Sequence, residues 1–155
     1  MRDHLRAALR SAASGSLPRA DNSFATAYEQ ALALALAGQL GTPAQALQRT
    51  TGIVSKWGGM WEHAGQFERA AEVYQLGWDE VTGAIEKGEV TEDGVMRGVS
   101  LAMKLGDCWV RLGRARDAQA EKAYSWAVQE MMRLGMSEKQ KVSLQSHSLA
   151  GQVWL

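Results

Sequence analysis

Three histidines, one cysteine and one adjacent Glu–His pair are the side chains in this sequence that could do acid–base, nucleophilic or metal chemistry. His4, His63 and His147 fall on separate predicted elements, and the single Cys108 cannot form an internal disulfide. Glu62 and His63 could serve as a base and its neighbour, but adjacent residues of a helix point in different directions. No HExxH, nucleophile elbow, phosphate loop, dinucleotide fingerprint or metal-ligand spacing is present. The sequence therefore predicts a protein that is not an enzyme and has no catalytic residue, cofactor or metal.

The elements that must position these residues are helices. Two prolines, abundant Ala, Leu, Glu and Gln, and the lack of alternating β-branched stretches predict an all-α fold. Thr42 followed by Pro43 marks a helix start, Thr91 or Asp93 marks another, and Gly88 and Gly135 mark helix ends. The predicted helices cover roughly residues 2–13, 23–38, 43–63, 66–87, 92–112, 117–134 and 138–150.

Length and charge narrow the class of protein. At 155 residues the chain is long enough to bury a core, and we expect one domain over residues 1–155. Lys plus Arg and Asp plus Glu number 17 each, so the net charge favours neither nucleic acid nor an anionic membrane as the main partner. The apolar run from Ala31 to Ala37 is too short to cross a bilayer, and we predict no membrane span.

The two ends of the chain each leave two interpretations open. Arg2, Arg6 and Arg10 recur at four-residue steps, as in a mitochondrial presequence, whereas Asp3 favours an ordinary capping helix with a solvated basic face. The helix predicted at 138–150 either covers the last hairpin or belongs to an interrupted further repeat.

A pattern of small and aromatic residues at helical spacing occurs twice, each time as a helix, a tight glycine turn and a second helix. The first copy consists of Trp57, Gly58, Trp61, the turn at Gly65, Phe67, Ala70, Tyr74 and Gly77. The second copy consists of Leu105, Gly106, Trp109, the turn at Gly113, Ala118 or Ala120, Tyr124 and Ala127. Two helices approach closely only where a small residue faces a bulky one, so the pattern predicts tight helix pairs whose tryptophans lie in the core.

This pattern resembles the tetratricopeptide repeat (TPR), which implies stacked antiparallel hairpins in a right-handed α-solenoid. The hairpins would cover about 2–38, 43–87 and 92–134, with a closing helix at 138–150. Gly58 and Gly106 are further apart than the usual period of about 34 residues, so the helices must be longer than usual.

Within that class, residues 24–135 are similar to fungal mitochondrial TPR adaptors of the inner-membrane i-AAA protease. The similarity is carried by Tyr28 to Leu32, Thr51 to Ile53 and Lys56 to Glu62. This family has a transmembrane segment ahead of a repeat domain in the intermembrane space and presents substrate proteins to the protease; this chain departs from it by having no such segment. The resemblance implies a mitochondrial location, and without it we would expect a cytoplasmic one.

In a TPR stack, the first helices of successive hairpins line a concave binding face. The residues implied for that face are Ser55, Gly59, Glu62 and His63 from one hairpin and Met103, Asp107, Val110 and Arg111 from the next. Gly59 and Asp107 stand where a clamp for a terminal carboxylate would need asparagine, so we expect a groove for extended or unfolded client polypeptides instead. The alternative is a scaffold or assembly factor in a fixed complex, such as a respiratory-chain complex.

Overall fold

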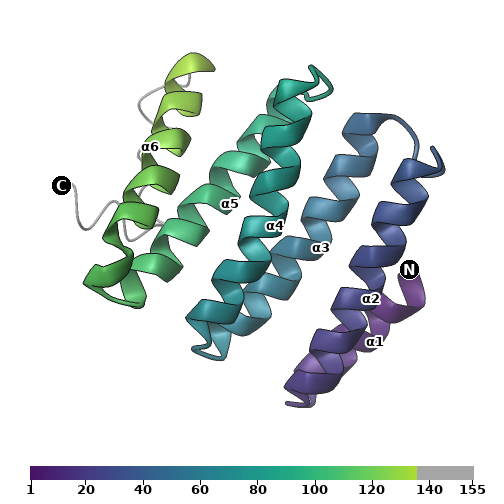
Figure 1. Ribbon diagram of the computed structural model, residues 1–155. Coiled ribbons are helices and arrows are strands. Elements are labelled where there is room, and N and C mark those ends of the chain that lie inside the picture. The colour runs from purple at the N-terminus through teal and green to yellow at the C-terminus, as the bar shows by residue number, and fades with distance from the viewer. Residues whose placement is uncertain (136–155) are drawn as a thin grey trace.

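The computed structural model describes residues 1–135, and this part of the chain is built from helices without strands (Figure 1). The elements are α1 (Arg2–Ala13), α2 (Leu17–Leu36), α3 (Pro43–His63), α4 (Phe67–Glu86), α5 (Glu92–Arg111), the short 3-10 helix η1 (Arg114–Arg116) and α6 (Asp117–Arg133). The predicted all-α class is confirmed. The helix predicted at 138–150, together with His147, lies outside the described residues.

The helix boundaries follow from capping residues that the sequence had marked. Thr42 accepts a hydrogen bond from the Gln45 backbone N–H at 3.3 Å, and the Gln45 side chain accepts one from the Thr42 N–H at 2.9 Å. This reciprocal capping box satisfies two N–H groups that would otherwise lack partners at the start of α3. Thr91 caps α5 by accepting from the Gly94 N–H at 3.2 Å, so both predicted starts are confirmed.

The start of α2 corrects one predicted boundary, because the helix begins at Leu17 and not near residue 23. Gly15, with φ of +79°, makes the turn after α1, and Pro18 fits the first turn of the new helix. The stretch from Ser11 to Asn22 is rich in Ser, Ala and Gly, and in composition it resembles a loop. Its small side chains instead permit close helix packing, with Ala8 of α1 and Ala20 of α2 both fully buried.

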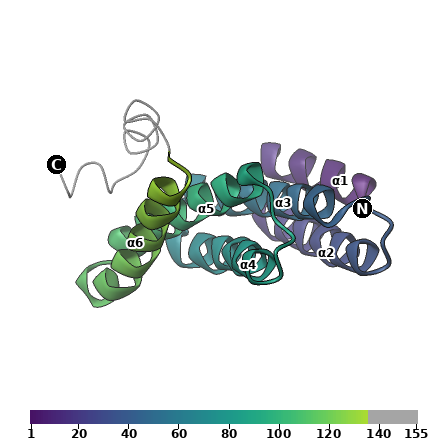
Figure 2. The ribbon, with the colours of Figure 1, turned by 90° about the horizontal axis from the view of Figure 1, so that it is seen from above.

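The helices fall into two layers. Figure 2 shows α1, α3 and α5 in one layer and α2, α4 and α6 in the other. Consecutive helices pack against each other along the chain, and α3 also contacts α5 within its own layer. We call the layer of α1, α3 and α5 the first layer and that of α2, α4 and α6 the second layer.

The same contact between a glycine and a tyrosine closes the core between α3 and α4 and between α5 and α6. A Cβ added to Gly58 would lie 2.4 Å from a ring carbon of Tyr74, and one added to Gly106 would lie 2.4 Å from a ring carbon of Tyr124. Each glycine thus lets the partner tyrosine lie directly against its helix backbone. The equivalence supports the predicted register of the two copies.

The second copy holds two extra residues between its turn and its tyrosine, and the structure shows where they go. Helix η1 takes up the extra length after Gly113, and α6 begins only at Asp117. Ala120 is buried at 3 % exposure, whereas Ala118 is exposed. Ala120 therefore occupies the small position, four residues before Tyr124, as Ala70 does before Tyr74.

The remaining residues predicted to pack the repeats lie inside the protein or at its margin. Those that are buried are Trp57, Trp61, Ala70, Gly77, Leu105 and Ala127. Trp109 is only half-buried, because its ring lies at the surface beneath the guanidinium of Arg116, 5.1 Å from the ring centroid. Trp78 is buried and meets Trp126 edge to face at 5.6 Å between ring centroids.

Candidate functional site

Helix α3 has one face packed into the core and one face left open along its whole length. The packed face is buried and includes Leu47, Thr50, Val54, Trp57 and Trp61. The open face recurs at three- and four-residue steps and consists of Gln45, Gln48, Arg49, Gly52, Ser55, Lys56, Gly59 and His63, all exposed or half-exposed. Because these positions share one side of the helix, they form a continuous strip, which we call the α3 groove.

The strip is hollowed at both ends by neighbouring helices, at its start by α1 and α5 and at its end by α4 and α5. Near the start of α3, a hollow of about 580 Å³ is also lined by Arg2 and Leu5 of α1 and Arg97 of α5. Near the end of α3, a hollow of about 400 Å³ includes Phe67 and Arg111. The groove thus has a floor from α3 and walls from α1 and α5, with the start of α4 closing its far end.

Two glycines in this floor have no packing partner that explains them. A Cβ added to Gly52 would meet nothing within 4 Å, and one added to Gly59 would meet only the Tyr74 hydroxyl, at 3.9 Å. A glycine inside a helix costs about 1 kcal/mol relative to alanine, so both weaken α3 without any gain in packing. Gly83, near the end of α4, is similarly open. Glycines on an open face allow another backbone to approach closely.

The structure brings together four of the eight residues that the sequence placed on a binding face. Gly59, Glu62, His63 and Arg111 line the same hollow, with Phe67 beside them. The guanidinium of Arg111 lies over the Phe67 ring at 5.0 Å from its centroid. Ser55 is exposed and lies on the open face of α3 about one turn earlier.

The other residues of that set, all from α5, lie elsewhere. Met103 and Asp107 are buried at 6 % and 7 % exposure, and Val110 is half-buried. The Tyr124 hydroxyl of α6 donates to Asp107 at 2.6 Å. Both side chains are thus enclosed, and Met103 does not offer the adaptable surface contact expected of it.

Glu62 and His63 do not form an acid–base pair. The Glu62 carboxylate accepts from the Tyr74 hydroxyl at 3.0 Å and pairs with the Lys104 ammonium at 3.4 Å. Burial, and then the nearby Glu62 charge, raise the pKa of the Tyr74 hydroxyl. Glu62 is thus engaged with α4 and α5, while His63 is exposed to solvent.

Cys108 is a packed residue and not a reactive one. Its side chain is fully buried, and burial, followed by the nearby carboxylates of Glu62 and Asp107, raises the pKa of the thiol to about 12. The thiolate needed for nucleophilic attack is therefore scarce at neutral pH. Across residues 1–135, no group of His, Cys, Asp and Glu side chains could hold a metal ion.

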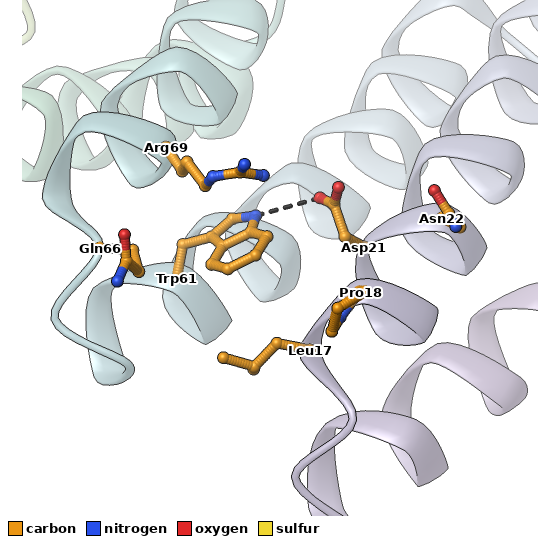
Figure 3. A pocket seen from close by; sticks show the side chains of 7 residues that line it. All are labelled: Leu17, Pro18, Asp21, Asn22, Trp61, Gln66 and Arg69. Atoms are coloured by element: carbon orange, nitrogen blue, oxygen red, sulfur yellow. Dashed lines mark hydrogen bonds between the residues drawn. The ribbon is translucent and has the colours of Figure 1, made fainter.

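A third hollow, of about 440 Å³, lies where the start of α2 meets the end of α3 (Figure 3). Asp21 accepts indole N–H bonds from Trp57 at 2.7 Å and from Trp61 at 3.1 Å on the same carboxylate oxygen. The Arg69 guanidinium lies over the Trp61 ring at 4.9 Å from its centroid. Asp21 thereby satisfies two largely buried donors and fixes α2 to α3, which is a structural role.

A half-buried carboxyl group, that of Glu80, joins three helices on the side of the second layer. Tyr28 of α2 and Thr50 of α3 both donate hydroxyl hydrogen bonds to Glu80 of α4, the latter at 2.5 Å. Burial raises the pKa of Glu80, although these hydrogen bonds act in the opposite direction. Burial, followed by the hydrogen bond to Glu80, also raises the pKa of Tyr28.

The sequence interpretation missed the half of the groove nearest the start of α3. Arg49, Gly52, Lys56 and Arg97 line that half but lie outside the twofold pattern that defined the predicted face. The signal was present in the three- and four-residue spacing of polar and small residues that continues upstream from Gly59.

The described helices include none that is both long and apolar enough to cross a membrane. The resemblance to TPR proteins and to the protease adaptors stays a prediction, carried by the sequence pattern alone. Comparison of the chain with protein-family models, with curated proteins and with solved structures gave no match.

Proposed function

We propose that this protein is a TPR-like α-solenoid that binds other proteins by receiving an extended polypeptide segment along the α3 groove. The observation that carries this proposal is the pair of glycines, Gly52 and Gly59, in the open floor of a helix that they destabilise. A bound backbone that lies against α3 gives these glycines a purpose that packing does not supply.

The dimensions of the groove fit a short extended segment. With 21 residues, α3 is about 30 Å long. An extended chain rises about 3.3 Å per residue, so about nine residues would span the helix. The polar and mixed character of the floor suits contacts to a peptide backbone and to varied side chains better than a single apolar anchor site.

The test combines a groove-filling variant with a matched control. Gly52→Trp together with Gly59→Trp would place two large side chains in the groove without entering the core, whereas Gly83→Trp makes the same kind of change on α4. Labelled protein is incubated with an array of random-sequence peptides of about nine residues, and the strongest binder is titrated by fluorescence anisotropy. We expect the groove variant to bind the peptide at least about tenfold more weakly than the parent, and the Gly83 variant to bind it like the parent. Equal binding by both variants would contradict the groove.

The resemblance extends this proposal to a specific role, namely delivery of client polypeptides to an inner-membrane AAA protease from the intermembrane space of mitochondria. The purified protease would then degrade an unfolded reporter faster when this chain is present. The tryptophan groove variant should lose that acceleration. If the chain changes no degradation rate while peptide binding persists, the adaptor role fails and the binding module stands.

A scaffold in a fixed assembly is the second candidate, and it is favoured by exposed apolar side chains in the second layer. Val128 and Met132 lie one turn apart on the same face of α6 and are 41 % and 65 % exposed. A tight folded partner would cover such a face. Replacing both with serine should release that partner in size-exclusion chromatography while leaving peptide binding unchanged.

A further inference from the structure

The half of the α3 groove nearest α1 is surrounded by positive charge from three helices. Arg2 of α1, Arg49 and Lys56 of α3, and Arg97 of α5 line its hollow of about 580 Å³. None of the residues that line it is acidic. The chain as a whole carries no net charge, so this concentration is local.

These cations are poorly compensated. Arg97 pairs with Asp93 at 3.2 Å, one turn away on α5. Arg2, Arg49 and Lys56 are exposed and make no ion pair within residues 1–135. Like charges gathered around a concave surface repel one another and focus a positive potential into it, and an anionic ligand relieves both effects.

The opposite layer has the opposite charge. Helix α4 carries five acidic side chains and one basic one, namely Glu68, Glu72, Asp79, Glu80 and Glu86 against Arg69. An acidic ligand is therefore attracted to the first layer and repelled by α4, which fixes the side from which it approaches.

We propose that this end of the α3 groove selects an acidic stretch of a partner polypeptide, an inference that rests on the proposed function and names the chemistry of its ligand. The charges come from three helices around Gly52, so they match several carboxylates along one extended backbone better than a single small anion. The carboxylates lie between Arg49, Lys56 and Arg97, and the peptide backbone passes over the open glycine.

The direct test compares two peptides that differ only in charge. The first is a fluorescein-labelled peptide of about nine residues in which Glu or Asp alternates with Leu or Ala, and the second carries Gln or Asn in place of each acid. Anisotropy titration of the full chain should show the acidic peptide binding about tenfold more tightly at low salt. The difference should shrink as salt screens the exposed charges.

Charge-reversal variants locate the effect. Arg49→Glu combined with Lys56→Glu should abolish the preference for the acidic peptide. Arg19→Glu combined with Lys122→Glu makes the same change in net charge at exposed positions of the second layer and should leave the preference intact. Circular dichroism melts confirm that each variant is folded.

Three results would overturn the inference. Equal binding of acidic and neutral peptides would remove the charge selection but leave the binding module standing, whereas failure of every peptide in the array would remove both. Tighter binding of a single-stranded oligothymidylate of similar length than of the acidic peptide would make the site one for nucleic acid, whose phosphates offer the same charge.

Discussion

Gly58 and Gly59 are neighbours on α3, yet they belong to two different regions of the molecule. The hydrogen of Gly58 faces Tyr74 so closely that an added Cβ would lie 2.4 Å from its ring, whereas Gly59 has only the Tyr74 hydroxyl at 3.9 Å. A rotation of about 100° around the helix thus separates a glycine required by packing from one that packing does not require. Helix α3 carries the fold on one face and the candidate binding function on the other.

The largest expected effect lies on the packed face. Gly58→Leu forces a branched side chain into the space of the Tyr74 ring, so α3 and α4 must separate or the ring must leave the core. We expect a loss of about 3 kcal/mol in the free energy of unfolding, measured by urea denaturation, and a similar loss for Gly106→Leu against Tyr124. Gly59→Leu is the matched control and should unfold at or slightly above the parent midpoint, because leucine is a better helix former than glycine. If Gly58→Leu also did so, the close contact would not exist.

A smaller loss is expected where the packed face meets α2. Asp21→Ala leaves the indole N–H groups of Trp57 and Trp61 without their shared acceptor. Unsatisfied buried donors cost about 1–3 kcal/mol each, and since both hydrogen bonds are only partly shielded from water we expect about 2 kcal/mol in total. Asp21→Asn keeps an acceptor oxygen and should recover most of the stability.

Asn22→Ala removes an exposed polar side chain next to Asp21 on the same helix. It controls for the general effect of losing a polar side chain near the start of α2. Equal stability of Asp21→Ala and Asn22→Ala would show that Asp21 does not hold α2 against α3.

The packed face could be predicted largely from the sequence, because its signals are local. Thr42, Pro43 and Thr91 mark helix starts with side chains that bond to the nearby backbone, and the Gly58–Tyr74 spacing repeats in Gly106–Tyr124. The start of α2 was misplaced because small residues are compatible with both a loop and a tightly packed helix.

The open face could be predicted only in part, because exposure depends on where distant helices lie. Gly59, Glu62, His63 and Arg111 were expected on one surface, and the structure brings them together. Met103 and Asp107 show helical spacing suited to the same surface, but both are buried, and Asp107 accepts a hydrogen bond from Tyr124 of α6. No local pattern shows which side of α5 that helix covers.

A gain in stability is expected on the open face. Gly59→Ala and Gly52→Ala each replace a helix-interior glycine at a site where the added methyl meets no close atom, so each should stabilise the protein by about 1 kcal/mol. Thermal melts and urea denaturation measure the gain. Gly77→Ala is the control on packing, since its Cβ would lie 2.8 Å from Leu101 and Val54, and it should destabilise. A loss of stability in Gly59→Ala would mean that both faces of α3 are packed.

The smallest expected effect is a pH dependence on the packed face, at the carboxyl group that Thr50 shares with Tyr28. Burial raises the pKa of Glu80 above its ordinary value of 4.5, so the folded state holds the proton more tightly than the unfolded state. Below pH 4.5 the group is neutral in both states, and its contribution to stability is fully present. As the pH rises, the unfolded chain ionises first, and this contribution is lost until the pH has passed the folded pKa. The Glu80→Gln variant cannot ionise at this position. Its stability relative to the parent, measured by urea denaturation, should therefore increase between pH 4 and pH 7.

Glu86→Gln, at an exposed position of the same helix, controls for the loss of one negative charge. If the stability difference between Glu80→Gln and the parent stayed constant with pH, the Glu80 carboxyl would be solvated like the side chains of the open face. The two faces of α3 would then differ only in how their glycines pack.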